Sequence, residues 1–334
     1  MLEQIAKKLG HTVLLHLPPE TAHIIGKEAI KRRVFASERY SNTELKTKIF
    51  GVELDNPLGL AAGFDKYAEL IDCIPYYGFG FIEDGSFTYL GGRGNKKPRL
   101  FRIKESQSLL NRMGLNGPSA HEAAEKLRHV KNLLFGVNIA KTHSKDILGD
   151  KAIDDIINSF DLLKHFGFYT MLNVSCPNTT EGKTFEEPSP LDELLKAILS
   201  RGKVKPLLIK ISPDLSINEL EKLVQVADDK VDGYGCGNTS KYNHPEHGQG
   251  GLSGQSLKEK SNMLLQNMNQ LTKKSLIGIG GIGSGEDMFE KYLNGAVLFQ
   301  AYTGFIYKGV DFAIRTLAEF TAIKRAHKEM FSKK

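Results

Sequence analysis

The sequence predicts an α/β protein built on a (β/α)8 barrel of the TIM type, with a small helical extension at its N-terminus. Between residues 55 and 310, short apolar runs alternate with longer amphipathic stretches. Alternating strands and helices indicate parallel pairing, because parallel strands need a crossover connection. Eight repeats over about 260 residues match the size of this barrel. A doubly wound open sheet is the alternative, but no G-x-G-x-x-G follows the first strand, where a dinucleotide-binding fold would carry it.

Each predicted strand is one of these short apolar runs, and helical periodicity fills most of the gaps between them. In Asp154–Phe166, apolar side chains recur at helical spacing, and Asn218–Ala227 shows the same pattern. The eight strands are predicted at Leu58–Ala62, Phe79–Glu83, Leu133–Ile139, Tyr169–Val174, Leu207–Ile211, Val231–Gly235, Ser275–Ile279 and Val297–Gln300.

Residues 1–40 lack the alternation of short apolar runs and amphipathic stretches. We expect them to form a helical extension to a barrel domain of residues 41–334. Leu2, Ile5 and Leu9 share one helical face, and a second candidate helix follows Pro18-Pro19. Seven Lys and Arg residues outnumber four acidic residues in this segment. Two short basic amphipathic helices could lie on an anionic membrane surface. The alternative is a helical pair packed over one end of the barrel.

The composition is that of an ordinary globular protein and excludes several classes. Of 334 residues, 40% are hydrophobic and 25% charged. The three cysteines, Cys73, Cys176 and Cys236, are widely spaced and odd in number, which argues against a disulfide scaffold and favours a reducing compartment. A net charge of +6 without tryptophan or a basic–aromatic repeat does not indicate nucleic-acid binding. No apolar run is long enough to span a membrane, and we expect no cleavable signal.

The segments that follow the predicted strands are nearly all polar or rich in glycine. Active sites of such barrels are built from the loops at the carboxyl ends of the strands. The eight segments therefore predict one ligand-binding face; in order they are A-A-G-F-D-K, D-G-S, A-K-T, S-C-P-N, S-P-D, C-G-N-T-S, G-G-I-G-S and A-Y-T-G.

The last two of these segments predict a phosphate site. Gly280-Gly281 and Tyr302-Thr303-Gly304 follow strands seven and eight, where barrels commonly bind phosphate through backbone N–H groups. Gly254 could add a further close approach of the backbone. The alternative is that these glycines only make tight loops.

Lysines and asparagines on the same face suggest a flat ligand that carries amide groups. Lys66 and Lys210 lie at or just past strand ends one and five, although either could be a solvated surface residue. A single asparagine is usually a turn former. Five asparagines on one face, each with paired donor and acceptor groups, could hydrogen-bond to a planar ring. The five are Asn111, Asn138, Asn173, Asn178 and Asn238. We expect no metal site, because no His, Asp and Glu cluster has ligand spacing, and no Ser hydrolase elbow is present.

Several longer motifs, in order over about residues 10 to 325, resemble the dihydroorotate dehydrogenase family. They are N-P-L-G-L-A-A-G-F-D-K (56–66), K-P-R-L-F-R (97–102), N-R-M-G-L-N (111–116), N-V-S-C-P-N-T (173–179), K-I-S-P-D-L (210–215), G-N-T (237–239), G-G-L-S-G (250–254) and I-G-I-G-G-I (277–282).

The resemblance implies an FMN enzyme that oxidises dihydroorotate to orotate in pyrimidine (UMP) biosynthesis. It places the FMN phosphate on the loops at Gly281 and Tyr302-Thr303. It assigns further flavin contacts to Ala62, Gly63, Lys66, Ser86, Asn138, Asn173, Lys210, Gly237 and Gly254. It assigns the substrate to Lys66, Asn111, Arg112, Met113, Gly114, Leu115, Asn173, Asn178, Asn238 and Thr239.

In this family a base removes a proton from C5 of dihydroorotate while C6 gives a hydride to flavin N5, and the residue at the base position is Cys176. A free thiol of pKa about 8.5 is about 3% thiolate at pH 7, and nearby cations such as Lys66 would raise that share. The resemblance places Lys210 near flavin N1, where it would stabilise charge on the reduced ring.

Two features that carry the resemblance point to different electron acceptors. The quinone-dependent class usually has a serine base, and the soluble class, which uses fumarate or NAD, usually has a cysteine. Residues 1–40, with L-P-P-E-T-A-H (17–23), look like the quinone-class extension, and Arg102 and Tyr302 match residues near its quinone tunnel. An added domain is a larger feature than one side chain, so we expect a membrane quinone as acceptor and a peripheral protein on the cytoplasmic face of the inner membrane.

Two departures from the family pattern bear on the pocket rim. Leu115 stands where an aromatic residue is usual, and Asp84 precedes Gly85-Ser86 where a neutral residue and threonine are commoner. Two other functions stay open at this point. One is a soluble dihydroorotate dehydrogenase with fumarate or NAD as acceptor. The other is a phosphate-ligand-binding barrel without redox chemistry.

Overall fold

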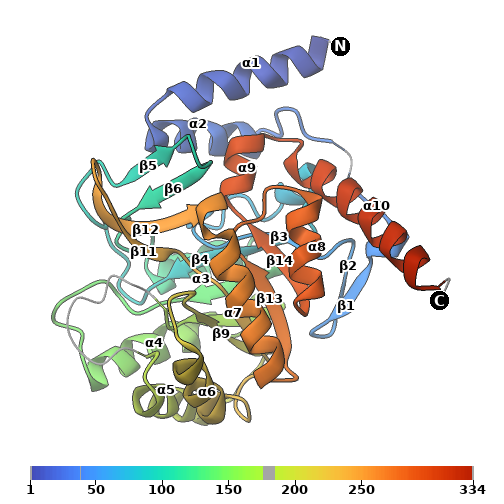
Figure 1. Ribbon diagram of the computed structural model, residues 1–334. Coiled ribbons are helices and arrows are strands. Elements are labelled where there is room, and N and C mark those ends of the chain that lie inside the picture. The colour runs from blue at the N-terminus through green and yellow to red at the C-terminus, as the bar shows by residue number, and fades with distance from the viewer. Residues whose placement is uncertain (1, 38, 176–184, 333–334) are drawn as a thin grey trace.

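A computed structural model describes residues 2–37, 39–175 and 185–332 and shows a closed barrel of eight parallel strands (Figure 1). The predicted barrel is therefore confirmed and the open sheet is excluded. In barrel order the strands are β3 (Leu58–Leu60), β4 (Phe81–Phe87), β7 (Phe135–Ile139), β8 (Tyr169–Asn173), β9 (Leu207–Ile211), β10 (Gly233–Cys236), β13 (Ser275–Ile279) and β14 (Ala296–Ala301).

Strand positions agree with the prediction at β9 and β13, and differ most at β4. The prediction ended this strand at Glu83, whereas β4 begins at Phe81 and continues to Phe87. Its pairing with β7 goes on past Glu83, through Asp84↔Val137 and Phe87↔Ile139, with an irregularity between them. A polar D-G-S stretch reads as a loop in the sequence, but here it is the carboxyl end of a buried strand.

The helices that follow the strands form the outer layer of the barrel. They are α3 (Ala120–Leu127), α4 (Asp150–Leu163), α5 (Pro188–Ser200), α6 (Ile217–Ala227), α7 (Lys258–Leu271), α8 (Gly285–Leu293), α9 (Thr303–Lys308) and α10 (Phe312–Ser332). Ser119 and Ser216 begin α3 and α6 with complete capping boxes. The short 3-10 helices are η1 (Thr43–Leu45), η2 (Ile74–Tyr77) and η3 (Gln255–Leu257).

The core has two parts, as expected for alternating strand faces. Inward-facing side chains such as Phe81, Met171 and Leu298 fill the barrel, and a larger cluster lies between strands and helices. The hairpin of β1 (Thr47–Ile49) and β2 (Val52–Leu54) adds Leu54 to the inner cluster, and its Phe50 packs 6.1 Å from Tyr169. The hairpin therefore closes the barrel beside Tyr169, where β8 begins. The polar side chains described below gather at the opposite end, where the strands finish.

A four-stranded antiparallel sheet that the sequence did not predict lies at the carboxyl ends of the barrel strands. Its order is β11 (Ser240–His244), β12 (Gly248–Gly254), β6 (Ser108–Asn111) and β5 (Leu100–Ile103). β12 pairs with β6, which is about 140 residues earlier, through Gly251↔Asn111 and its neighbours. Because these strands are short and their partners distant, local periodicity carries little signal for them.

The N-terminal extension is the predicted pair of helices, α1 (Leu2–His16) and α2 (Pro19–Lys31). Figure 1 shows α1 lying over α2 at the end of the molecule that carries β5, β6 and α9. Leu2, Ile5, Leu9 and Val13 of α1 are exposed. Among the described helices, none is both long and apolar enough to cross a membrane.

Candidate functional site

A cavity of about 400 Å³ opens at the carboxyl ends of the barrel strands, between the added sheet and α2. It brings together most of the predicted site residues from all parts of the chain. The predicted residues that line it are Ala62, Gly63, Lys66, Ser86, Asn111, Met113, Gly114, Leu115, Asn173, Lys210, Asn238, Thr239, Gly254, Gly281, Tyr302 and Thr303. Arg112, Asn138 and Gly237 are not among the lining residues, and Cys176 and Asn178 lie outside the described residues.

A buried carboxylate, Glu83 on β4, organises the floor of the cavity. Its Oε1 accepts from Lys210 Nζ at 3.0 Å and from Asn138 Nδ2 at 2.8 Å. Its Oε2 accepts from the Tyr169 hydroxyl and from Gln300 Nε2, each at 2.8 Å. Burial opposes ionisation, but the Lys210 charge and these hydrogen bonds outweigh it and lower the pKa of Glu83. Lys210 is thus held at the end of β9 and aimed into the cavity.

The sequence prediction missed Glu83 and Gln300. Both stand in predicted strands that are otherwise apolar, and a charged or amide side chain at an inward position of a barrel strand was the available signal. Within the described residues, Asn138 Oδ1 and Gln300 Oε1 are buried and have no hydrogen-bond donor. Because buried polar atoms are almost always paired, the Gln300 oxygen, which belongs to a cavity-lining residue, favours a ligand with N–H or O–H groups at the floor of the cavity.

Lys66 contributes a half-buried cation to the cavity from the loop after β3. Its Nζ donates to Asn116 Oδ1 at 2.7 Å. Burial, together with the charge of Arg99, lowers the pKa of Lys66 to about 8. At neutral pH the ammonium is therefore still charged, but it is available to an anionic ligand because none of the ion pairs of the described residues includes it.

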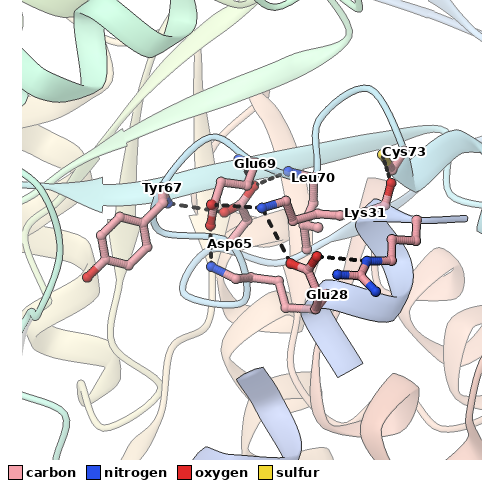
Figure 2. A network of polar contacts seen from close by, with 9 residues as sticks. Glu28, Lys31, Asp65, Tyr67, Glu69, Leu70 and Cys73 are labelled. Carbon is pink, nitrogen blue, oxygen red and sulfur yellow. Dashed lines mark hydrogen bonds and ion pairs between the residues drawn. The ribbon is translucent and has the colours of Figure 1, made fainter. Parts of the chain in front are cut away.

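The loop that carries Lys66 is held by its neighbour Asp65 (Figure 2). The Asp65 carboxylate accepts from the N–H groups of Tyr67 at 3.1 Å, Glu69 at 2.7 Å and Leu70 at 2.6 Å. Glu69 in turn pairs with Lys31 of α2 at 3.2 Å and with Lys27. The N-terminal extension is therefore tied directly to the loop that places the cavity lysine.

Asparagines and serines form a second polar cluster where β8 and β10 end. Asn173 donates to Ser86 Oγ at 3.2 Å and accepts from Ser175 Oγ at 3.2 Å. Asn238 donates to Asn173 Oδ1 at 3.3 Å and to Ser175 Oγ at 2.9 Å. Gly237, with φ of 131°, admits no side chain because a Cβ would lie 2.3 Å from Ile279 O. The predicted amide-rich surface is therefore assembled, directly before the segment that contains Cys176.

Glycine-rich backbone at the ends of β12, β13 and β14 forms a narrow cradle at one side of the cavity. Gly254, Gly280 and Gly281 all have positive φ, at 98°, 92° and 71°. A Cβ on Gly281 would lie 2.5 Å from Lys258 Cα, and one on Gly254 would lie 2.5 Å from Gln107 O. Thr303 Oγ1 lies 2.8 Å from Ser253 Oγ across the cradle. Exposed N–H groups on such a backbone suit a phosphate.

The Arg112 side chain points away from the cavity. Its guanidinium donates to Gln249 O at 3.0 Å and to His247 O, and lies 4.8 Å over the Phe101 ring. These contacts join the loop of residues 111–116 to the β11–β12 hairpin. Arg112 is not among the residues that line the cavity, whereas Asn111 lines it and donates to Gly251 O at 3.2 Å.

A second cavity, of about 460 Å³, lies between α1, α2 and α9 and is lined mainly by apolar side chains. His23 and Phe64 line both cavities, and the Phe64 ring lies 5.0 Å from His23 and 5.4 Å from Tyr302. Burial, helped by the Lys66 charge, lowers the pKa of His23 to about 4, so its imidazole is neutral. Arg102 lines this cavity and donates to the carbonyls of Leu14 and Leu17 at the end of α1, at 3.0 Å and 2.6 Å.

Comparisons with known proteins agree with this geometry. A family model described as dihydroorotate dehydrogenase matches residues 44–323. A protein of Christiangramia forsetii named dihydroorotate dehydrogenase (quinone) is 35% identical over 305 residues, which cover 88% of this chain and 86% of that protein. One of the same name from Thermus thermophilus is 36% identical over 330 residues, with 92% and 94% covered. A crystal structure of DHODH from Eimeria tenella in complex with ferulenol has a TM-score of 0.86 at 29% identity, with 94% and 95% covered.

Proposed function

The chain belongs to the dihydroorotate dehydrogenase family, and from this premise we propose that it oxidises dihydroorotate to orotate with FMN and delivers the electrons to a membrane quinone. The observation that carries the proposal is the pair of adjoining cavities. One is polar, with a backbone cradle for a phosphate, and the other is mainly apolar. His23, Phe64, Leu100 and Leu109 line both of them.

The residues of the first cavity fit FMN. The glycine cradle of Gly254, Gly280 and Gly281 suits its phosphate, and the unpaired oxygen of Gln300, which lines the cavity, suits an N–H group of a flavin ring. When bound, FMN supplies a hydride acceptor for C6 of dihydroorotate. Lys210, held by Glu83, would place a fixed positive charge near the ring, and that charge would favour the reduced, more negative flavin.

The substrate would lie beside the amide cluster, with its carboxylate near Lys66. Asn111, Asn173 and Asn238 offer donors and acceptors that match the amide edges of dihydroorotate. Cys176 would take the proton from C5 as the general base. Its side chain lies outside the described residues, but Ser175, which directly precedes it, is buried and hydrogen-bonded to Asn173 and Asn238.

The second cavity supports a quinone as the electron acceptor. Its apolar lining suits a quinone ring with an isoprenoid tail, and the neutral His23 adds no charge that would have to be desolvated. The exposed apolar residues of α1 and the basic residues of the extension favour docking on an anionic surface. We therefore place the enzyme peripherally, on the cytoplasmic face of the inner membrane. A soluble enzyme using fumarate or NAD would have no use for this cavity.

The test is an acceptor panel on the purified protein, with a soluble quinone analogue, fumarate and NAD. We expect a yellow protein that couples dihydroorotate oxidation to quinone reduction. Filling the second cavity by Ala29→Phe should lower quinone reduction at least about tenfold, because it occludes apolar volume, and should leave anaerobic flavin reduction by dihydroorotate unchanged. Ala318→Phe, on the exposed surface of α10, is the matched control. A colourless protein that FMN cannot reconstitute would contradict the proposal, and turnover with fumarate alone would favour the soluble alternative.

A pH dependence of orotate binding should follow from Lys66. Its pKa of about 8 lies below the ordinary value, so its charge is present below pH 8 and is lost as the pH rises through 8. Orotate affinity should therefore be constant from pH 6.5 to 7.5 and fall by up to about tenfold per pH unit above 8. Calorimetric titration of the FMN-loaded protein measures this. Lys66→Met should bind orotate weakly at every pH, and a flat wild-type profile to pH 9.5 would show that Lys66 does not bind the carboxylate.

A further inference from the structure

Lys291, on α8, is a fully buried lysine behind the Gly280-Gly281 loop. Its Nζ donates to Ser261 Oγ and, at 2.8 Å, to Asn262 Oδ1, both on α7. In the described part of the chain, no carboxylate oxygen lies within ion-pair distance of this nitrogen. Burial lowers the pKa of Lys291 to about 8, which leaves it charged at neutral pH. A buried ammonium without a carboxylate partner is costly, so its presence here calls for a function.

Ser261 connects this lysine to the glycine loop. Its Oγ lies 3.0 Å from Ile279 O and 3.2 Å from Gly280 O. An ammonium group can only donate, so Ser261 Oγ must accept from Lys291, and the hydroxyl hydrogen is left for these two carbonyls. The cation therefore also fixes the direction in which Ser261 donates.

The same contact determines where two backbone N–H groups point. In a planar trans peptide, the C=O of one residue and the N–H of the next point in opposite directions. Because the carbonyls of Ile279 and Gly280 face Ser261 in the helical layer, the N–H groups of Gly280 and Gly281 face the other way. Both glycines line the first cavity. Among the described residues, neither N–H group has an acceptor.

The far end of the loop is held by the same two helices. Asp287 of α8 accepts from Gly283 N at 2.8 Å and pairs with Lys258 of α7 at 2.7 Å. Glu290 pairs with Lys258 at 2.8 Å and accepts from Asn262 at 2.9 Å. The polar network therefore runs from Lys291 through both helices to the loop, and holds residues 280–283 at each end.

We propose that Lys291, acting through Ser261, is a positioning residue that orients and polarises the Gly280 and Gly281 N–H groups to bind the phosphate of FMN. The inference rests on the proposed function, since it takes FMN as the ligand. It adds that phosphate affinity depends on a cation that does not contact the cofactor. Its charge acts through one hydroxyl and two peptide dipoles, in a buried layer where such interactions are strong.

The test compares FMN with riboflavin, which has the same ring and no phosphate. Dissociation constants of both are measured by flavin fluorescence with the flavin-free full-length protein. Lys291→Met keeps an unbranched side chain that is one atom shorter and removes the charge. We expect it to weaken FMN binding at least about tenfold and riboflavin binding less than about twofold. Ser261→Ala, which keeps the cation, should shift the same ratio in the same direction by a smaller factor.

Met268→Ala is the matched control, because Met268 is buried on the same helix two turns after Ser261 and is part of the apolar core. It should lower stability without changing the FMN-to-riboflavin ratio. If Lys291→Met does not fold, Ser261→Ala decides the question alone. A ratio within about twofold of the wild type in the folded variants would overturn the role of Lys291. A wild-type protein that binds neither flavin would overturn the proposed function, and this inference with it.

Discussion

Replacing Cys176 by alanine is expected to leave FMN bound and to lower kcat by about 10²–10⁴, the usual contribution of a general base. A methyl group cannot take the C5 proton, so dihydroorotate would bind without reacting. Cys176→Ser should keep part of the activity, because serine can take the C5 proton when its own hydroxyl proton is passed to a neighbouring group. Its pH–rate profile should be displaced upward, since the hydroxyl loses its proton less readily than a thiol.

Anaerobic stopped-flow reduction of the bound flavin by dihydroorotate measures this step apart from the acceptor reaction. FMN stoichiometry from the visible spectrum shows whether the cofactor site is intact. Cys73→Ala is the matched control, because Cys73 is a half-buried thiol whose described contact is with the carbonyl of Lys31 in the extension. Normal flavin reduction in Cys176→Ala would show that another group is the base.

Replacing Glu83 by glutamine is expected to lower the free energy of unfolding by about 3–5 kcal/mol, the cost of leaving one charge of a buried pair without its partner. The Glu83 side chain is fully buried and that of Lys210 is 5% exposed. Glutamine keeps the shape of Glu83 and part of its hydrogen bonding, but it cannot compensate the Lys210 ammonium. The loss should appear in urea unfolding of the flavin-free protein.

A second change separates the charge effect from a packing effect. Adding Lys210→Met to Glu83→Gln removes the uncompensated cation, so the double variant should recover part of the lost stability. It should not recover turnover, because the fixed charge beside the flavin is then absent. The exposed pair of Lys203 and Asp232, 2.8 Å apart, is the control, and Lys203→Met should cost less than about 1 kcal/mol. Equal losses at the two pairs would contradict the central role of Glu83.

The sequence by itself determined the barrel, because its signal is local. Apolar runs such as Leu207–Ile211 and Ser275–Ile279 coincide with β9 and β13, and the helical face of Ile156, Phe160 and Leu163 is buried in α4. Strand ends identify the ligand-binding face once parallel pairing is accepted, so Lys66, Lys210 and the glycines of the cradle could be predicted to lie at the cavity. The two helices of the extension could also be predicted from the periodicity of their apolar residues.

Only the tertiary structure decided which of these residues touch one another. Glu83, Asn138, Tyr169, Lys210 and Gln300 come from five separate strands, and their shared network depends on barrel closure, which no local pattern encodes. The added sheet pairs β6 with β12 across about 140 residues, and the second cavity exists only because α1 and α2 pack beside α9. The support of Gly280-Gly281 by a lysine on α8 is of the same kind. Residue type and periodicity are local properties, whereas a site is a set of distances between elements that the chain brings together only when it folds.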